Sequence, residues 1–309
     1  MPADIYSLAP INLRLAGAGA DIVIPAENHA FSAEILANPF FHSGNVSPTQ
    51  ITVPGANPRV TVSMPFADAF SAFGLSMVKL TTLDVFLSKY ADFLRLGVTS
   101  HPNINLTAGA FAGAQITDWS VGVDGILMAE VTFDMFSNDQ DNPFEIGSGL
   151  TLPVVATEPV LHTLGPALLN NVVIPGLSAN NGSINGQTII QRSDGDLFPR
   201  VGARPQIQPT ARLAHNDPIA VLAALGLLGT TVTATTELYF KEYSPTTGVV
   251  RSDGGAVKLA IAKGRLNPDG WQAGQGAVAT TGINVIGYAA DGIANPFVVT
   301  LNTVPPATP

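Results

Sequence analysis

Four acidic residues lie close together in the sequence, at Asp134, Asp139, Asp141 and Glu145. Carboxylates at such short separations can share a calcium ion, or they can divide the acid and base roles of a glycosidase. Their spacing lacks the regular positions of a calcium-binding loop. The sequence therefore favours a solvated or partner-facing loop over a cation or sugar site between residues 134 and 145.

Other residue types that carry out chemistry are scattered along the chain. The histidines show no pair at a spacing suited to a metal ion; they are His29, His42, His101, His162 and His215. The sequence contains no cysteine, which excludes disulfides and thiolate metal sites. No dinucleotide-binding fingerprint, Walker loop or nucleophile elbow is present. We expect no catalytic residue, no cofactor and no metal ion, and therefore no enzyme.

The composition indicates a protein whose surface is largely covered. Charged residues make up 12% of the chain, against about 25% in an average protein. Apolar residues make up 46%, and the chain has 30 glycines and 24 prolines. So few charges solvate a large free surface poorly, which favours burial against other subunits. The alternative is a compact secreted or thermally robust monomer.

The charge is unevenly distributed along the chain. The formal net charge is −9. Residues 1–155 carry 14 acidic and 5 basic residues, which leaves 9 of each in residues 156–309. A protein that grips nucleic acid needs lysine and arginine to displace counterions from the phosphates, so this chain is not expected to do so. Its acidic first part would suit the wall of a passage along which DNA slides without sticking.

Two features bear on membranes and export. The longest apolar run, Pro218–Gly229, has 12 residues, fewer than the roughly 18 to 20 that span a bilayer. The first residues contain no basic cluster followed by an apolar block, so they do not read as a signal peptide. We expect no membrane association.

Two segments of the sequence are alike. One runs from Trp119 to Phe144 and the other from Trp271 to Phe297, and both close on Asn-Pro-Phe. Other matched residues lie 153 positions apart, namely Pro65 and Pro218, Ala67 and Ala220, Tyr90 and Tyr243, and Leu106 and Leu259. Upstream, Val23-Ile24-Pro25 and Val173-Ile174-Pro175 lie 150 apart. We therefore predict two tandem repeats of about 150 residues, each the size of an ordinary domain.

Short strands dominate the expected secondary structure. Alternation and β-branched residues predict strands at residues 21–25, 50–53, 59–64, 83–90, 104–107, 116–123, 125–135, 237–243, 257–260 and 279–288. Apolar residues at helical spacing predict a short helix from Pro65 to Phe73 and another from Pro218 to Gly229. Asp124-Gly125 predicts a hairpin turn. The fold class is therefore β-rich α+β, with two homologous β-sandwich or barrel domains and one short flanking helix in each.

The expected organisation divides the chain into five parts. They are an N-terminal arm (1–20), a first β-sandwich repeat (21–155), a linker (156–170), a second β-sandwich repeat (171–301) and an extended tail (302–309). The arm has little with which to pack, so we expect a neighbouring subunit to order it. Residues 176–200 are rich in glycine, asparagine and serine and are expected to form a long loop.

Two recurring motifs are interpreted as structural. Asn-Pro-Phe begins at Asn38, Asn142 and Asn295, and the last two copies lie at the same point of the repeat. We interpret them as proline turns that deliver a phenylalanine into the core at the start of a strand. Trp119 and Trp271 are expected to be core anchors whose indole N–H groups find a carbonyl oxygen.

The run ITDWSVGVDGILMAEVTFDMFS resembles a segment of the major tail tube proteins of long, flexible-tailed bacteriophages. The matching residues are Trp119, Ser120, Val121, Val123, Asp124, Gly125, Ala129, Val131 and Phe133, about 25 positions of the chain being covered. The resemblance implies stacked rings of six β-sandwich domains, each with a flanking helix. A duplicated chain resembles the variant in which three two-domain chains make a pseudo-hexameric ring.

These observations lead to one expected function and two alternatives. We expect a structural virion protein of the phage tail, assembled in the host cytoplasm, which forms homotrimeric rings stacked around a DNA conduit and contacts other virion proteins. Three two-domain chains can close a ring of near six-fold symmetry. The first alternative is a tandem-barrel capsid protein that forms pseudo-hexameric trimers. The second is another tail or baseplate component or a secreted carbohydrate-binding protein.

Overall fold

The structure is a computed structural model of the whole chain. It describes residues 11–41, 43–44, 46–86, 101–122, 125–138, 140–154, 158–174, 176–186, 188–217, 230–232, 235–244, 246–251, 253–272, 280–289 and 295–307. Residues 11–154 are called the first half below and residues 158–307 the second half. The fold is β-rich, with several sheets and, in the part of the chain described, a single helix.

Alternating apolar residues build the central strands. In the strand RVTVSMP the three alternate residues Val60, Val62 and Met64 are fully buried, as the period of a half-buried strand requires. The following helix has only eight residues, and it ends at Gly74, whose φ of 63° suits a glycine. Both elements lie where the sequence predicts them.

The first half contains eleven strands and the helix. They are β1 (Ile11–Leu15), β2 (Ile22–Ile24), β3 (Asn28–Ser32), β4 (Ile35–Phe40), β5 (Gln50–Ala56), β6 (Arg59–Pro65), α1 (Phe66–Phe73), β7 (Val78–Phe86), β8 (His101–Leu106), β9 (Ala110–Gly122), β10 (Met128–Ser137) and β11 (Phe144–Leu150). Helix α1 packs against β6, β9 and β10 and buries two of its three phenylalanines, Phe66 and Phe73.

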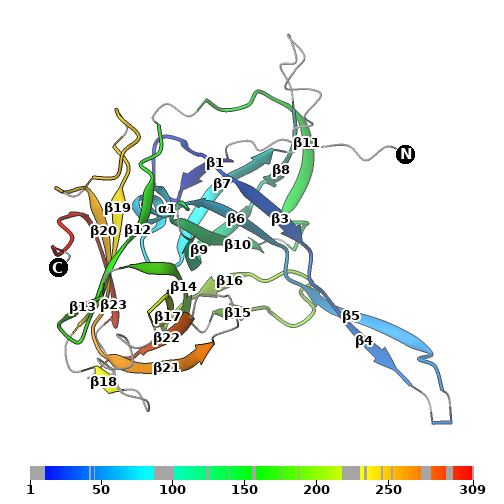
Figure 1. Ribbon diagram of the computed structural model, residues 1–309. Coiled ribbons are helices and arrows are strands. Elements are labelled where there is room, and N and C mark those ends of the chain that lie inside the picture. The colour runs from blue at the N-terminus through cyan, green and yellow to red at the C-terminus, as the bar shows by residue number, and fades with distance from the viewer. Residues whose placement is uncertain are drawn as a thin grey trace, which may run out of the picture.

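The described residues of the second half contain twelve strands. They are β12 (His162–Leu169), β13 (Val172–Ile174), β14 (Leu177–Asn185), β15 (Ile189–Gln191), β16 (Val201–Ala203), β17 (Gln208–His215), β18 (Thr230–Val232), β19 (Thr236–Glu242), β20 (Ala256–Ile261), β21 (Gly264–Gln272), β22 (Thr280–Gly287) and β23 (Phe297–Thr303). Strands β12, β13, β19, β20 and β23 form a separate five-stranded sheet, on the left in Figure 1.

One sheet runs through both halves. In the first half β3 pairs with β6, β6 with β10 and β10 with β9. Strand β9 then pairs antiparallel with β14, and the sheet continues through β17 and β22 to β21. The pairing of β9 with β14 therefore joins the two halves, and it is called the internal seam below. A single apolar core, with Val131 in the first half and Leu213 and Leu259 in the second, extends through both.

The order of pairing in the second half repeats that in the first. The path β3–β6–β10–β9 corresponds to β14–β17–β22–β21, and β7–β8–β11 corresponds to β19–β20–β23. Strands β1 and β2 likewise correspond to β12 and β13. In each half one hairpin, β4–β5 or β15–β16, is inserted before the strand that corresponds to β6.

The registers match residue by residue when the two tryptophans are aligned. Trp119 pairs with Ala129 in the first half, and Trp271 pairs with Thr281 in the second, each 152 positions later (119 to 271, 129 to 281). Both strand pairs also carry a β-bulge on the same side of the tryptophan. For β3 and β6 the shift is 151, which lies between the shift of 150 found further upstream in the sequence and the shift of 153 found from Pro65 onward.

Part of the expected N-terminal arm, residues 1–20, is a core strand. Ile11 and Leu13 in β1 are fully buried, and β1 pairs with both β2 and β7. The alternation INLRL covers only five residues, too few to stand out beside the alanine and glycine that follow. Residues 1–10 lie outside the described residues.

The expected linker, residues 156–170, contains strand β12. This strand pairs with β19, and its register shifts between Leu164 and Ala167, where Gly165 and Pro166 lie. Because a bulge shifts the alternation of inward and outward residues, the strand lacked a clear period in the sequence. The expected extended tail begins at residue 302, but β23 continues to Thr303, and residues 304–307 after it form no regular element.

The expected long loop, residues 176–200, contains strand β14. Leu177–Asn185 is rich in asparagine, serine and glycine, which are uncommon in strands. It nevertheless lies between β9 and β17 and pairs with both. The predicted helix at residues 218–229, the hairpin turn at Asp124 and the end of the strand predicted at residues 83–90 lie outside the described residues.

Candidate functional site, a polar hollow at the internal seam

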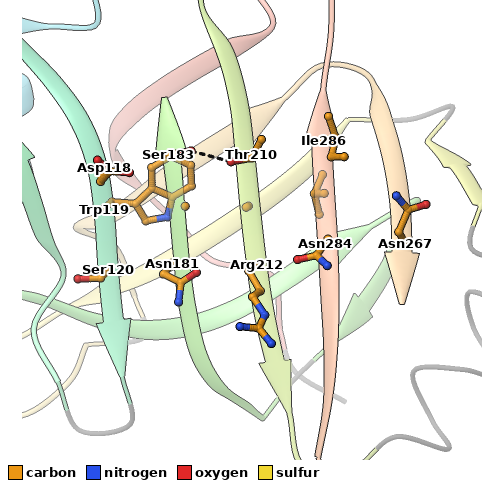
Figure 2. A pocket seen from close by; sticks show the side chains of 13 residues that line it. Asp118, Trp119, Ser120, Asn181, Ser183, Thr210, Arg212, Asn267, Asn284 and Ile286 are labelled. Carbon is orange, nitrogen blue, oxygen red and sulfur yellow. Dashed lines mark hydrogen bonds between the residues drawn. The ribbon is translucent and has the colours of Figure 1, made fainter. Parts of the chain in front are cut away.

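A hollow of about 600 Å³ lies on the sheet where the two halves meet. Its lining residues come from five neighbouring strands, β9, β14, β17, β22 and β21 (Figure 2). A single hollow can span five consecutive strands only if the sheet curves around it. This face of the sheet is therefore the concave one.

Strand pairing arranges the polar side chains of the hollow in two transverse rows. The first row is formed by the polar residues Asp118, Ser183 and Thr210 and by the apolar Ile286, each directly opposite the next. The second row, two residues further along the strands, is formed by Ser120, Asn181, Arg212, Asn284 and Asn267. Because alternate residues of a strand point to opposite faces, the residues between these rows face the core. The two rows therefore lie on the face of the sheet that points away from the core, and all of their residues except Ile286 are polar.

The hollow offers hydrogen bonds rather than a paired acid and base. Its polar side chains are hydroxyls and amides, with one carboxylate, Asp118, and one guanidinium, Arg212, and apolar residues such as Ile286 complete the lining. The Ser183 and Thr210 hydroxyl oxygens lie 2.7 Å apart in a hydrogen bond. None of the residues that line the hollow is a histidine.

Asp118 lies at the edge of the hollow. Burial raises the pKa of its carboxyl group above the ordinary value, and the hydrogen bond from Thr117 and the charge of Arg204 oppose the rise. Burial also lowers the pKa of the Arg204 guanidinium, which donates to the backbone oxygen of Ile116 at 2.7 Å. Arg204 thus anchors the chain after β16 to β9 across the internal seam.

Trp119 holds the internal seam from the core side. It is 1% exposed, and its indole Nε1–H donates to Oδ1 of Asn180 at 3.2 Å. Its ring stacks on Phe297, with the centroids 5.4 Å apart and the planes at 16°. The expectation of a buried anchor with a satisfied N–H is confirmed for Trp119, and both partners belong to the other half. For Trp271 only the backbone, in β21, is described.

A glycine makes room for this tryptophan. Gly182 lies directly opposite Trp119 in β14. A Cβ atom there would lie 2.2 Å from Cζ2 of Trp119 and 2.4 Å from the backbone oxygen of Thr210. The polar, glycine-containing sequence of β14 is thus explained by what it must do at the seam: Asn180 accepts the indole N–H and Gly182 admits the ring.

The hairpin β15–β16 of the second half also covers the first half. Arg192 donates to the backbone oxygen of Ala56 at 3.0 Å and also bonds Asn57. Gly202 lies on the ring of Phe136, which is 1% exposed. The backbone N–H of Ser137 donates to the oxygen of Pro199 at 2.9 Å. The two halves are therefore joined by a strand pairing and by a hairpin that closes over it.

The acidic residues between 134 and 145 do not come together. Asp134 lies in β10 and is 3% exposed, whereas Asp141 and Glu145 are exposed on the surface. Glu145 accepts a hydrogen bond from Asn105 at 2.9 Å. Asp139 lies outside the described residues. In the described ranges no group of three or more histidine, aspartate or glutamate side chains is placed to hold a metal ion.

Asp134 is instead one partner of a half-buried ion pair. Its Oδ1 lies 2.8 Å from Nε of Arg59, and its Oδ2 accepts from Gln115 at 3.1 Å. Arg59→Met would keep the apolar stem and leave a buried carboxylate with one neutral donor. We expect the free energy of unfolding to fall by about 1–3 kcal/mol, measured by urea denaturation.

The matched control for this change is Arg14→Met. Arg14 pairs with Asp21 at 2.7 Å, but both side chains are well exposed, at 43% and 39%. An exposed pair contributes only about 0–1 kcal/mol. Equal losses in the two variants would show that burial of Asp134 does not matter.

The histidines are spread over the molecule. His29 lies in β3, and its Nδ1 is buried without a hydrogen-bond partner among the described residues. His215 ends β17, and His162 begins β12, where its Nε2 lies 3.0 Å from the backbone oxygen of Gly255. His42 and the side chain of His101 lie outside the described residues.

His162 makes stability depend on pH. Burial lowers the pKa of His162 from 6.5, and the hydrogen bond to Gly255 and the charge of Glu242 partly oppose this shift. The unfolded chain therefore takes up the proton more readily than the folded chain. The free energy of unfolding should fall as the pH drops below about 6.5. Urea denaturation of His162→Gln between pH 7 and pH 5 should give a shallower slope than the wild type, and an unchanged slope would contradict this assignment.

Two of the Asn-Pro-Phe motifs begin a strand, as predicted, and one of them delivers its phenylalanine fully into the core. Phe144 and Phe297 are the first residues of β11 and β23, and Phe297 is fully buried. The backbone N–H of Phe297 donates to Oδ1 of Asn295 at 3.1 Å, which fixes the turn. In the third motif Phe40 lies in β4 and is 52% exposed.

The hollow could not be found from the sequence. Its lining residues are single polar positions in five strands that span residues 118 to 286, and none of them forms a motif.

No helix in the described parts of the chain is both long and apolar enough to cross a membrane. No protein-family model matches the chain, and no curated protein shows significant sequence similarity to it.

Proposed function

We propose that this chain is a structural virion protein, a subunit of a phage tail tube that forms stacked trimeric, pseudo-hexameric rings around a DNA conduit. The observation that carries the proposal is the sheet that runs without a break from one half into the other. Each half contributes a four-strand unit, β3–β6–β10–β9 in the first half and β14–β17–β22–β21 in the second. The two units follow each other in the same order along the sheet. Further copies can therefore extend the sheet until it closes.

The strand count supports a wide barrel. Four strands in each half give eight per chain, and three chains give 24 (3 × 8). With strands about 4.8 Å apart and tilted as in known barrels, such a barrel is roughly 40–50 Å across between backbones. Barrels of 16 to 18 strands already leave an aqueous channel. A duplex would pass through this one.

The polar hollow supports the same assignment. In a closed barrel the concave face points inward, so the hydroxyls and amides of the hollow would line the passage. In the first half the same face carries Glu130 directly opposite Asp118. A wall with few cations releases few counterions from DNA and therefore binds it weakly. Genomic DNA is a passing cargo in this proposal, without specific binding.

Exposed apolar side chains support burial against other subunits. The hairpin β4–β5 extends away from the body in Figure 1. It carries Ile35, Phe40, Ile51 and Val53, each 48–63% exposed. Apolar residues clustered on a projecting hairpin favour contact with another protein. Neighbouring rings and other virion proteins are the proposed partners, with assembly in the host cytoplasm.

We also propose that the two halves arose by tandem duplication and that each is a β-sandwich with a flanking helix. The matched pairing order and the bulge at the same position support a common origin. Duplication frees the two seams of a ring to diverge, which fits an acidic first half and a neutral second half.

Electron microscopy of the purified protein tests the proposal. We expect open-ended tubes or isolated rings with a central channel. Closed shells or flat tiles would indicate the capsid alternative, and dispersed single particles that bind a sugar would indicate a carbohydrate-binding protein. Either result would overturn the tube assignment.

A further inference from the structure

Strand β14 and its counterpart β3, which begin the two four-strand units, differ in their strand partners within one chain. Strand β14 pairs with β17 on one side and with β9 on the other. Its counterpart β3 pairs with β6, and among the described residues its other edge has no strand partner. Four of the five residues of β3 are exposed, and Phe31 is 38% exposed.

Strands β9 and β21, which end the two four-strand units, differ in their strand partners in the same way. The first part of β9, Ala112–Ala114, pairs with β7, and the part from Asp118 to Gly122 pairs with β14. In β21, residues 264–266 pair with β18 in the register that a shift of 152 predicts. From Asn267 to Gln272 no described strand occupies that edge. Among the described residues, both partners of a seam that the chain already forms once therefore have an edge without a strand neighbour.

We propose that β21 of one copy pairs antiparallel with β3 of the next copy in the register of the internal seam. Residues of β21 lie 152 positions after their counterparts in β9, and residues of β3 lie 151 positions before their counterparts in β14. The internal pairs Trp119–Gly182 and Ser120–Asn181 therefore correspond to the pairs Trp271–Phe31 and Gln272–Ala30 between copies. This contact rests on the self-assembly proposed above and names the surfaces that carry it. Repeated from copy to copy, it is a head-to-tail contact that closes into a ring.

The residues at the proposed contact fit a tryptophan from the next copy. At the internal seam Trp119 bonds Asn180, and the residue in that place on β3 is His29 (180 − 151). The His29 ring nitrogen Nδ1 is buried and has no hydrogen-bond partner among the described residues, so it could accept from an indole N–H of the next copy only if the His29 side chain turned toward the edge of the sheet. Directly opposite Trp271, Phe31 gives an aromatic cross-strand pair.

The proposed contact also differs from the internal seam. Gly182 is replaced by Phe31, which already packs edge-on against Phe144, with ring centroids 4.7 Å apart. Phe144 remains partly exposed, whereas its counterpart Phe297 is covered by Trp119.

A second contact follows from the hairpins. Gly202 of β16 covers Phe136 at the internal seam, and Phe136 corresponds to Tyr288 (136 + 152), which is 47% exposed. Gly202 corresponds to Ile51 in β5 (202 − 151), which is 62% exposed. In the head-to-tail contact the β4–β5 hairpin of the next copy would lay Ile51 on Tyr288, so that two exposed apolar groups cover each other.

Cysteine pairs test the register directly, because the chain has no cysteine of its own. The variant carrying Ala30→Cys and Gln272→Cys places two thiols directly opposite across the proposed contact. On oxidation of the assembled protein we expect covalent dimers and trimers on a non-reducing gel, with little material above three chains. Ala30→Cys alone should give no covalent dimer, because a head-to-tail contact does not bring two β3 strands together.

The internal seam supplies the matched control. Ser120→Cys with Asn181→Cys introduces the corresponding pair within one chain, where both residues are exposed and directly opposite. On oxidation it should form a disulfide within one chain, so its band on the non-reducing gel should stay at the position of a single chain. A second control, Ala30→Cys with Thr300→Cys, places the second thiol on β23 in the other sheet and should give no ladder.

The outcomes separate the contact from the function. If tubes or rings form and the control pair oxidises, but Ala30→Cys with Gln272→Cys gives no ladder, the register is wrong and the tube assignment stands. A covalent dimer of Ala30→Cys alone would mean that β3 pairs with itself and would also overturn the contact. If light scattering finds only single chains at all concentrations, both proposals fail.

Discussion

Trp119→Ala is expected to lower the free energy of unfolding by about 3–5 kcal/mol, the usual cost of removing a buried large aromatic side chain. The change removes a ring that is 1% exposed and its stacking on Phe297, and it leaves the Oδ1 atom of Asn180 without its donor. Because both partners lie in the second half, the loss should weaken the union of the halves as well as the first half itself. Urea denaturation followed by circular dichroism measures it.

The matched variant is Trp271→Ala. Its tryptophan takes the corresponding position in β21, on an edge that no described strand covers. We expect the dispersed chain to lose much less stability than with Trp119→Ala, while light scattering shows a loss of assembly. An equal loss of stability in the two variants, with assembly retained in Trp271→Ala, would show that Trp271 is an internal anchor and not a contact between copies.

Gly182→Ala should be the most damaging small substitution at the seam. The new Cβ would lie 2.4 Å from the backbone oxygen of Thr210 as well as 2.2 Å from the ring of Trp119. A side chain can rotate away, but the backbone of a central strand cannot move without opening the sheet. We expect a loss of about 3 kcal/mol, at the upper end of the usual cost of overpacking, in the same urea assay.

Gly122→Ala is its control. Gly122 lies in the same strand pair, opposite Ala179, and a Cβ there would meet no atom within 4 Å. Its stability should stay close to that of the wild type. If the two alanine variants were equally stable, the close approach of Trp119 and β17 to Gly182 would be wrong.

The sequence predicts the elements that follow simple periods. Strand β6 alternates buried and partly exposed residues, and α1 follows Pro65 at helical spacing, so both could be located with bounds close to those observed. Phe144 and Phe297 begin their strands because a turn signal precedes each. In these segments the local preference and the tertiary environment agree.

The missed strands are those in which a neighbour decides the structure. Strand β14 has the composition of a loop, and it is a strand because β9 and β17 bond both of its edges and Trp119 requires Gly182 and Asn180. In β12 a bulge at Gly165 and Pro166 shifts the alternation. Such effects act between residues far apart in the chain, so no local pattern reports them.

The site was missed for a related reason. The residues that attract attention in the sequence, Asp134, Asp141 and Glu145, are separated by the fold: one is buried beside Arg59 and the others point outward. The polar face is formed instead by ordinary residues such as Asn181 and Thr210, which strand register alone brings together. The sequence predicts only the charge balance and the low charge content of that face, because neither property depends on strand register.

Cryo-electron microscopy of the assembled protein, at a resolution that separates strands, tests the central claim most directly. We expect a closed ring of three chains, about 96 kDa (3 × 32.0 kDa), with β3 of each copy beside β21 of its neighbour and the polar hollow facing the channel. A two-fold dimer, or a ring in which β3 and β21 both face solvent, would contradict it.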